Sequence, residues 1–199
     1  MVKRYLSHTD WKSFQTIKML SELIKTDRLI LRVFSLVDVE DILLYASDPE
    51  WARFLPVPQP YTRADAEKFV AGQVLQDRKT RVSWAIEHAG SVIGGINIGF
   101  DFDNRVGEMG YSIARRFWGK GLTTEAVGAV IDEAFSAYPD LNRIRATADE
   151  RNVGSLRVME KLGMVREGVL RQDIYLRGEF KDMVWCGLLR DEWEARKNR

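Results

Sequence analysis

The chain has 199 residues, of which 45% are hydrophobic and 30% are charged, as in ordinary soluble globular proteins. This length suits one domain with a terminal extension, and the formal net charge of +1 argues against a nucleic-acid binder with a broad basic face. The one cysteine, Cys186, excludes an internal disulfide, and no apolar run reaches membrane-spanning length. Because the N-terminus also lacks a secretory signal pattern, we expect a cytoplasmic protein that binds neither nucleic acid nor membrane.

Residues 1–24 are predicted to form a helical N-terminal extension ahead of a domain at 25–199. Apolar residues recur there near helical spacing, namely Trp11, Phe14, Ile17, Leu20 and Ile24. Such an amphipathic helix packs on its own domain or on a second subunit, and the second arrangement would make the protein a homodimer.

The first half of the domain predicts a strand at 28–33, a short helix at 37–45 and a proline-rich segment at 48–61. That segment is expected to be a fixed loop, which either connects elements or walls a binding pocket. A capping box begins a helix at 62–76, and strands follow at 83–88 and 92–100. Glycines inside the second strand, Gly94, Gly95 and Gly99, predict a bulge or a close backbone approach.

A strand at 106–113 completes an antiparallel meander, and a helix is expected at 122–138. A strand follows at 143–148, and Asn152 is placed to cap a short helix that ends at Gly163. A hairpin with strands at 165–175 and 183–189 comes next, and residues 191–199 form a polar tail. The pattern predicts one α/β domain.

The turn between the strand at 106–113 and the helix at 122–138 is predicted to bind an anion. Gly119 and Gly121 allow a tight turn with exposed N–H groups, and the helix dipole points at the same place. Three cationic side chains add positive charge around it: Arg115, Arg116 and Lys120. A phosphate or diphosphate is the natural ligand, and a plain glycine-rich turn is the alternative.

Two familiar phosphate motifs fit this turn poorly. A P-loop needs four residues between its glycines, and a Rossmann fingerprint needs a small residue where Thr124 stands. The order Arg116-x-x-Gly119-x-Gly121 resembles instead the diphosphate-binding motif of the GNAT acetyltransferases.

Further segments resemble the same family over residues 24–193. They are Glu108-x-Gly110-Tyr111-x-Ile113, Asn152-x-x-Ser155 and Glu160-Lys161-x-Gly163-Met164. The opening Thr26-x-Arg28-Leu29-x-Leu31-Arg32, with the closing Gly178-x-x-Lys181-Asp182 and Asp191-Glu192-Trp193, resembles the RimJ/RimL-type branch, which acetylates N-terminal amines of ribosomal proteins. The resemblance implies a GNAT fold, in which a mixed, mostly antiparallel sheet of about seven strands is flanked by helices and has splayed central strands.

The resemblance implies acetyl-CoA as the donor and no metal. The diphosphate would bind the N–H groups of Trp118, Gly119, Lys120, Gly121, Leu122 and Thr123, with Arg116 and Lys120 as counter-charges. The pantetheine arm would lie between the strands that end at Ile113 and Ala148. Asn152 would hydrogen-bond the pantetheine amides, and a simple helix cap is the alternative role for it.

The resemblance also assigns the chemistry. A backbone N–H near Ser112 or Ile113 would stabilise the negative charge that grows on the thioester oxygen. Many GNAT enzymes protonate the leaving thiolate with a tyrosine, but that position is Met159 here, so Ser155 is the candidate donor. Strand alternation puts Glu108 on one face with Ser112, which makes Glu108 the candidate general base; a surface or ion-paired glutamate is the alternative.

Three functions stay open at this point. The first is a protein N-terminal amine acetyltransferase, and the second is an acetyltransferase of a small molecule such as a polyamine, an aminoglycoside or an amino acid. The third is a non-catalytic acyl-CoA-binding protein. A polyamine site should gather carboxylates such as Asp48, Asp101 and Asp103, whereas a peptide site should offer an open groove.

Overall fold

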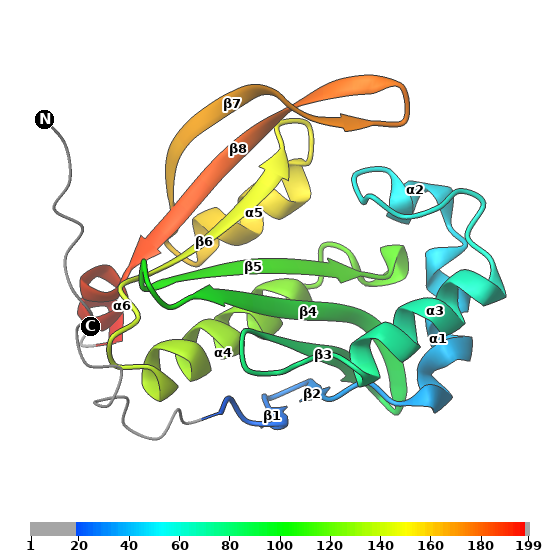
Figure 1. Cartoon of the computed structure of the whole chain (residues 1–199), viewed down its shortest axis with the longest axis horizontal. Helices are drawn as coiled ribbons and strands as arrows, with labels where there is room; N and C mark the ends of the chain where they lie inside the picture. The colour runs from blue at the N-terminus through cyan, green and yellow to red at the C-terminus, as the bar shows by residue number, and fades with distance from the viewer. Residues whose placement is uncertain (1–18, 198–199) are drawn as a thin grey trace, which may run out of the picture.

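The computed structural model describes residues 19–197 and consists of one eight-stranded sheet with helices on both faces (Figure 1). The sheet order is β1-β2-β3-β4-β5-β6-β8-β7, and β5 and β6 are its parallel pair. The strands are β1 Leu23–Lys25, β2 Ile30–Arg32, β3 Arg81–His88, β4 Ser91–Asp101, β5 Val106–Ile113, β6 Arg143–Asp149, β7 Val165–Leu176 and β8 Glu179–Leu189. The expected mixed, mostly antiparallel sheet is confirmed, with one strand more than expected.

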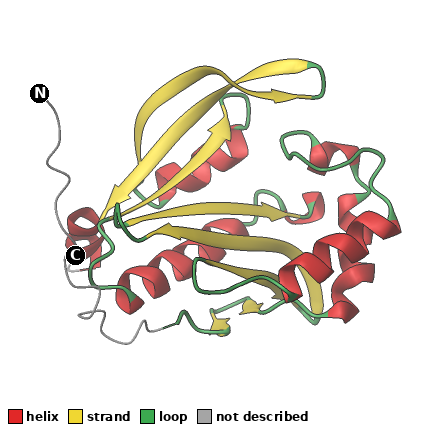
Figure 2. Cartoon of the chain, in the orientation of Figure 1, coloured by secondary structure: helices red, strands yellow, loops and turns green. Residues whose placement is uncertain are grey.

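The helices form two groups, which Figure 2 shows in red. They are η2 Leu36–Asp38, α1 Val39–Ala46, α2 Pro49–Ala52, α3 Arg63–Val74, η3 Arg115–Phe117, α4 Leu122–Ala137, α5 Val153–Lys161 and α6 Arg190–Lys197. Successive side chains of a strand point to opposite faces of the sheet and so reach different helices. On β3, Trp84 packs in the core with α4, whereas its neighbour Ala85 packs in the core with α1 and α3. At this point β3 therefore buries side chains under helices on both of its faces.

The predicted helix at residues 1–24 is wrong in its last part, from residue 19 onward. Residues Leu23–Lys25 form the edge strand β1, and Leu20 is buried in the core. The backbone N–H of Ser21 donates to the Glu133 carboxylate at 2.8 Å, and the Trp84 indole donates to the Ser21 carbonyl at 2.9 Å. These bonds hold the segment extended. The other positions of that prediction, at 1–18, lie outside the described residues.

The polar tail expected at 191–199 is helical over its described part, because residues Arg190–Lys197 form α6. One apolar side chain anchors this polar helix: the Trp193 ring stacks on Phe135 of α4 at 5.0 Å between centroids, and its indole N–H donates to Asp132 at 2.6 Å.

Gly94 shows the close backbone approach that glycines in this strand predicted. A Cβ atom at Gly94 would clash with the carbonyl oxygen of Ser112 on β5. The pairing of β3 with β4 also shifts register between Ile86 and Glu87, opposite this glycine. Both features lie in β4. This strand pairs with β5, and β5 leads into the candidate site.

Candidate active site

Strands β5 and β6 pair over only part of their length. Their register runs from Val106↔Arg143 to Met109↔Ala146 and then stops. Beyond that point β5 continues to pair with β4 as far as Ile113, and β6 continues to pair with β8 as far as Asp149. Residues 110–113 and 147–149 therefore present facing edges that do not bond to each other, which confirms the predicted splay of the central strands (Figure 1).

The turn after β5 presents unused N–H groups. Gly119 and Gly121 have φ angles of +73° and +77°, and α4 begins at the next residue, Leu122. Within the described part of the chain, the backbone N–H groups from Gly119 through Thr124 donate to no acceptor. They lie at the positive end of the dipole of α4, so the turn fits an anion such as a diphosphate.

Trp118 does not supply the amide that the sequence assigned to it. Its backbone N–H donates to the Arg115 carbonyl at 3.0 Å, as the end of η3. Its indole N–H donates to the Ile113 carbonyl at 2.9 Å. The row of available amides therefore begins one residue later than predicted and includes Thr124.

The three cationic side chains of the turn have different surroundings. Arg115 pairs with Asp48 at 2.7 Å, so its charge is already neutralised. The Arg116 guanidinium and the Lys120 ammonium lie 5.0 and 5.2 Å from the centroid of the Phe117 ring. Neither has a carboxylate partner among residues 19–197, which leaves both charges available to an anion.

Asn152 and Ser155 lie in the first turn of α5, which follows β6. The Asn152 side-chain oxygen accepts the Ser155 N–H at 3.1 Å, so the helix-cap role is confirmed. Its amide nitrogen donates to no group in the described chain, so it can still bond a ligand. Met159, two turns further on, is 1% exposed and sits in the core.

Tyr111 is a site residue that the sequence reasoning did not single out for a role. Its hydroxyl donates to the Ser155 carbonyl at 3.2 Å and so joins β5 to the first turn of α5. Burial raises the pKa of Tyr111, so the hydroxyl stays protonated as a donor. Alternation along β5 already places Tyr111 with Met109 and Ile113 on the face toward α4, but its partner on α5 becomes visible only in the fold.

Glu108 lies on the opposite face of β5 and is ion-paired. Its Oε2 atom lies 2.9 Å from Nε and 2.8 Å from Nη2 of Arg145 on β6. The Arg145 guanidinium also lies 4.8 Å from the centroid of the Trp185 ring on β8. The structure thus shows the ion-paired glutamate that the sequence analysis kept as the alternative, with its side chain 47% exposed.

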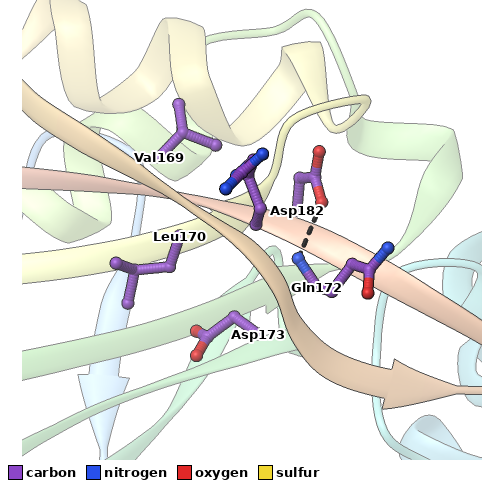
Figure 3. Close-up of a pocket in the computed structure, with 6 residues that line it drawn as sticks. Val169, Leu170, Gln172, Asp173 and Asp182 are labelled. Atoms are coloured by element: carbon purple, nitrogen blue, oxygen red, sulfur yellow. Dashed lines mark hydrogen bonds between the residues drawn. The ribbon is translucent and has the colours of Figure 1, made fainter.

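Two shallow grooves lie on the β6–β8 side of the sheet. One of about 610 Å³ runs beside the Glu108 pair and is lined in part by Val106, Arg145 and Trp185. The other, of about 640 Å³, follows the irregular stretch of β7 where Gln172 has a φ angle of +55° and donates its N–H to Asp182 at 2.8 Å (Figure 3). Both are open surfaces rather than enclosed small-molecule cavities.

The carboxylates that a polyamine site would gather lie apart. Asp48 pairs with Arg115, which follows the C-terminal end of β5. Asp101 instead bonds Asn104 at 2.7 Å in the turn that precedes β5. Since β5 has eight residues, these carboxylates are separated by roughly 23 Å of strand.

Residues 48–61 border this region and contain the short helix α2, where the sequence predicted an irregular fixed loop. The segment is nevertheless fixed, as predicted. Asp48 holds one end to Arg115, and the Arg177 guanidinium, at the tip of the β7–β8 hairpin, donates to the carbonyls of Arg53, Leu55 and Val57 at 3.3, 2.9 and 3.0 Å. The Arg177 side chain therefore links the hairpin tip to this segment.

The parted strands with an amide-rich turn at their end define an acyl-CoA-dependent transferase fold, and the comparisons with known proteins agree. Residues 28–165 match the family model described as an acetyltransferase (GNAT) domain. The chain belongs to the GNAT acetyltransferase family and is an N-acetyltransferase by that membership.

Three relatives illustrate the likeness. "Uncharacterized N-acetyltransferase p20" of Bacillus licheniformis is 32% identical over 178 residues, which cover 86% of this chain and 98% of the relative. "Putative ribosomal N-acetyltransferase YdaF" of Bacillus subtilis is 39% identical over 109 residues, or 54% of this chain and 59% of that protein. The solved structure of RimL, a ribosomal L7/L12 alpha-N-protein acetyltransferase in complex with coenzyme A, superposes with a TM-score of 0.75 at 19% identity, covering 86% of this chain and 99% of that one.

Proposed function

We propose that this enzyme transfers the acetyl group of acetyl-CoA to the N-terminal α-amine of a protein. The observation that carries the proposal is the row of unused N–H groups from Gly119 through Thr124, at the end of a strand whose edge parts from β6. The row suits a diphosphate, and the parted edges suit an arm that carries amides.

The residues around this gap fit acetyl-CoA. The diphosphate binds the N–H groups of the turn, with Arg116 and Lys120 as counter-charges. The free amide nitrogen of Asn152 donates to a pantetheine carbonyl, and a backbone N–H at Ser112 or Ile113 donates to the thioester oxygen. The full set of donor-binding residues proposed is Ser112, Ile113, Arg116, Gly119, Lys120, Gly121, Leu122, Thr123, Thr124, Asn152 and Ser155.

The chemistry needs a proton acceptor and a donor. As the amine nitrogen forms a bond to the acetyl carbon and the carbon–sulfur bond breaks, the amine proton passes through a water to Glu108. The half-exposed Arg145 pair leaves the second carboxylate oxygen of Glu108 free to accept from that water. Ser155 donates to the departing sulfur, because Met159 has no proton to give.

Two observations support a protein acceptor. The surface beside Glu108 is an open groove, and the carboxylates that would hold a polyamine are separated along β5. The names of YdaF and RimL, which are similar proteins, both point to ribosomal proteins as acceptors.

The test is an acceptor panel with acetyl-CoA, read by thiol release and by the mass of the products. One peptide carries a free N-terminus and blocked lysines, and a matched peptide carries a blocked N-terminus and free lysines. Spermidine, an aminoglycoside and a free amino acid complete the panel. The proposal expects turnover with the first peptide; turnover with small amines alone would overturn it, and coenzyme A binding without any turnover would indicate a non-catalytic binder.

A further inference from the structure

The Thr26-x-Arg28 motif lies far from the site in sequence but contacts the amide-rich turn in the fold. Its two residues belong to the turn between β1 and β2, and both bond Glu125 in the first turn of α4. The Thr26 hydroxyl lies 2.6 Å and the Arg28 backbone N–H 2.9 Å from Oε1 of Glu125. The Arg28 guanidinium lies 2.7 and 2.6 Å from Oε2 through Nε and Nη2. We call these three residues the loop brace.

The loop brace also holds the backbone of the turn. Arg28 Nη1 donates to the Lys120 carbonyl at 3.0 Å. In a trans peptide the C=O and N–H groups point in opposite directions, so holding this carbonyl directs the N–H of Gly121 to the other side. The Glu125 N–H likewise bonds the Gly121 carbonyl at 3.1 Å, which directs the N–H of Leu122 outward. The brace therefore bonds the carbonyls of Lys120 and Gly121 and leaves the N–H groups of Gly121 and Leu122 free to bind a ligand.

We propose that the loop brace of Thr26, Arg28 and Glu125 holds the turn in the shape that binds the donor's diphosphate, so that these are positioning residues for acetyl-CoA. This inference rests on the proposed function. Arg28 is already paired with a carboxylate, unlike Arg116 and Lys120, so it acts through the geometry of the turn rather than as a counter-charge.

The first experiment compares wild type with Arg28→Ala by calorimetric titration with coenzyme A and by steady-state kinetics. Loss of the charge-assisted bonds should weaken coenzyme A binding about tenfold or more and raise KM for acetyl-CoA similarly, while kcat at saturating donor changes little. A general loss of folded enzyme would lower kcat instead. A raised KM for acetyl-CoA with an unchanged kcat therefore identifies a positioning role. Arg63→Ala is the matched control, because Arg63 pairs with Glu40 on the surface at 2.8 Å and touches no part of the turn.

Glu125→Ala separates positioning from simple charge. This change removes a negative charge beside the diphosphate and frees the Arg28 guanidinium, so electrostatics alone predicts tighter coenzyme A binding. The brace predicts weaker binding, and a double variant with Arg28→Ala no weaker than the worse single variant. Tighter or unchanged binding in Glu125→Ala, or unchanged binding in folded Arg28→Ala, would overturn the inference. If wild type itself bound no coenzyme A, the proposed function would fail first.

Discussion

Glu108 and Arg145 are register partners on the parallel strands β5 and β6, one position before the pairing of these strands ends at Met109 and Ala146. Their ion pair therefore stands where the gap between the strands begins. A carboxylate at this point is beside the place where the parted edges would hold a thioester, on the face that carries the open groove.

Glu108→Gln tests the proposed base. Because the glutamine keeps the size and loses the proton acceptor, kcat should fall on the order of 10²-fold with little change in coenzyme A affinity. The free energy of unfolding should change by less than about 1 kcal/mol, since the pair with Arg145 is half exposed. Glu40→Gln, which breaks the exposed pair with Arg63, is the matched control and should keep full turnover, because Glu40 does not line the groove beside Glu108. An unchanged rate in Glu108→Gln removes this residue from the mechanism.

Ser155→Ala tests the donor to the leaving sulfur. One hydrogen bond lost from the transition state should lower kcat about tenfold. The bond from the Ser155 backbone N–H to Asn152 survives the change, so the melting temperature should change little. Equal turnover for variant and wild type would show that the sulfur leaves without this hydroxyl.

Two variants of Asn152 separate its cap role from its ligand role. Asn152→Asp keeps the side-chain oxygen that accepts from Ser155 but replaces the amide nitrogen, so it should keep stability and weaken coenzyme A binding. Asn152→Ala should weaken coenzyme A binding and also lower the free energy of unfolding by about 1 kcal/mol, because it removes the cap as well. Thermal melts and coenzyme A titrations of the two variants decide the matter. Wild-type binding by Asn152→Asp would leave Asn152 as a cap alone.

Arg177→Ala tests the link between the hairpin tip and residues 48–61. Loss of its three bonds to backbone carbonyls should free this segment and raise KM for the peptide acceptor several-fold, with coenzyme A affinity unchanged. Arg171→Ala is the control, because this exposed arginine of β7 bonds no group within the described chain. A shift in coenzyme A affinity, with acceptor KM unchanged, would contradict this role.

The pH dependence of the loop brace has a definite sign. Burial alone would raise the pKa of Glu125, but the bonds from Thr26 and Arg28 outweigh it and hold that pKa below its usual value. A carboxyl with a lowered folded-state pKa stabilises the fold above its unfolded pKa of about 4.3, and this stability is lost as the pH falls through the folded value. The melting temperature of wild type should therefore exceed that of Glu125→Gln at neutral pH, and the difference should shrink below about pH 4. A difference that grows toward acid would contradict the assignment.

Local signals predicted much of this structure from the sequence. The period-two pattern of β5, the glycines at 119 and 121 and the cap at Asn152 are short-range features, and the structure has each where it was expected. The register of the parallel strands is different, because it joins Glu108 to a residue 37 positions away. No local pattern encodes such a pairing, so the sequence could not decide whether the Glu108 carboxylate is free or ion-paired.

The parts that sequence reasoning missed depend on long-range contacts. Strand β1 has three residues and exists because β2 is beside it, and α6 is a polar helix held by Trp193 on Phe135. Arg177 reaches carbonyls 120 to 124 positions earlier in the chain. The amide of Trp118 was misassigned because a glycine motif does not reveal that a short turn of η3 helix uses that N–H.

The proposed function depends most on the N–H groups from Gly119 through Thr124 as the binding site for a diphosphate. Nitrogen-labelled protein titrated with coenzyme A, and followed by amide NMR, tests this directly. We predict large shifts of these amide signals at saturation, and a smaller shift for the Trp118 amide, which already donates to Arg115. Binding that leaves the Gly119–Thr124 signals unmoved, or no binding at all, would contradict it.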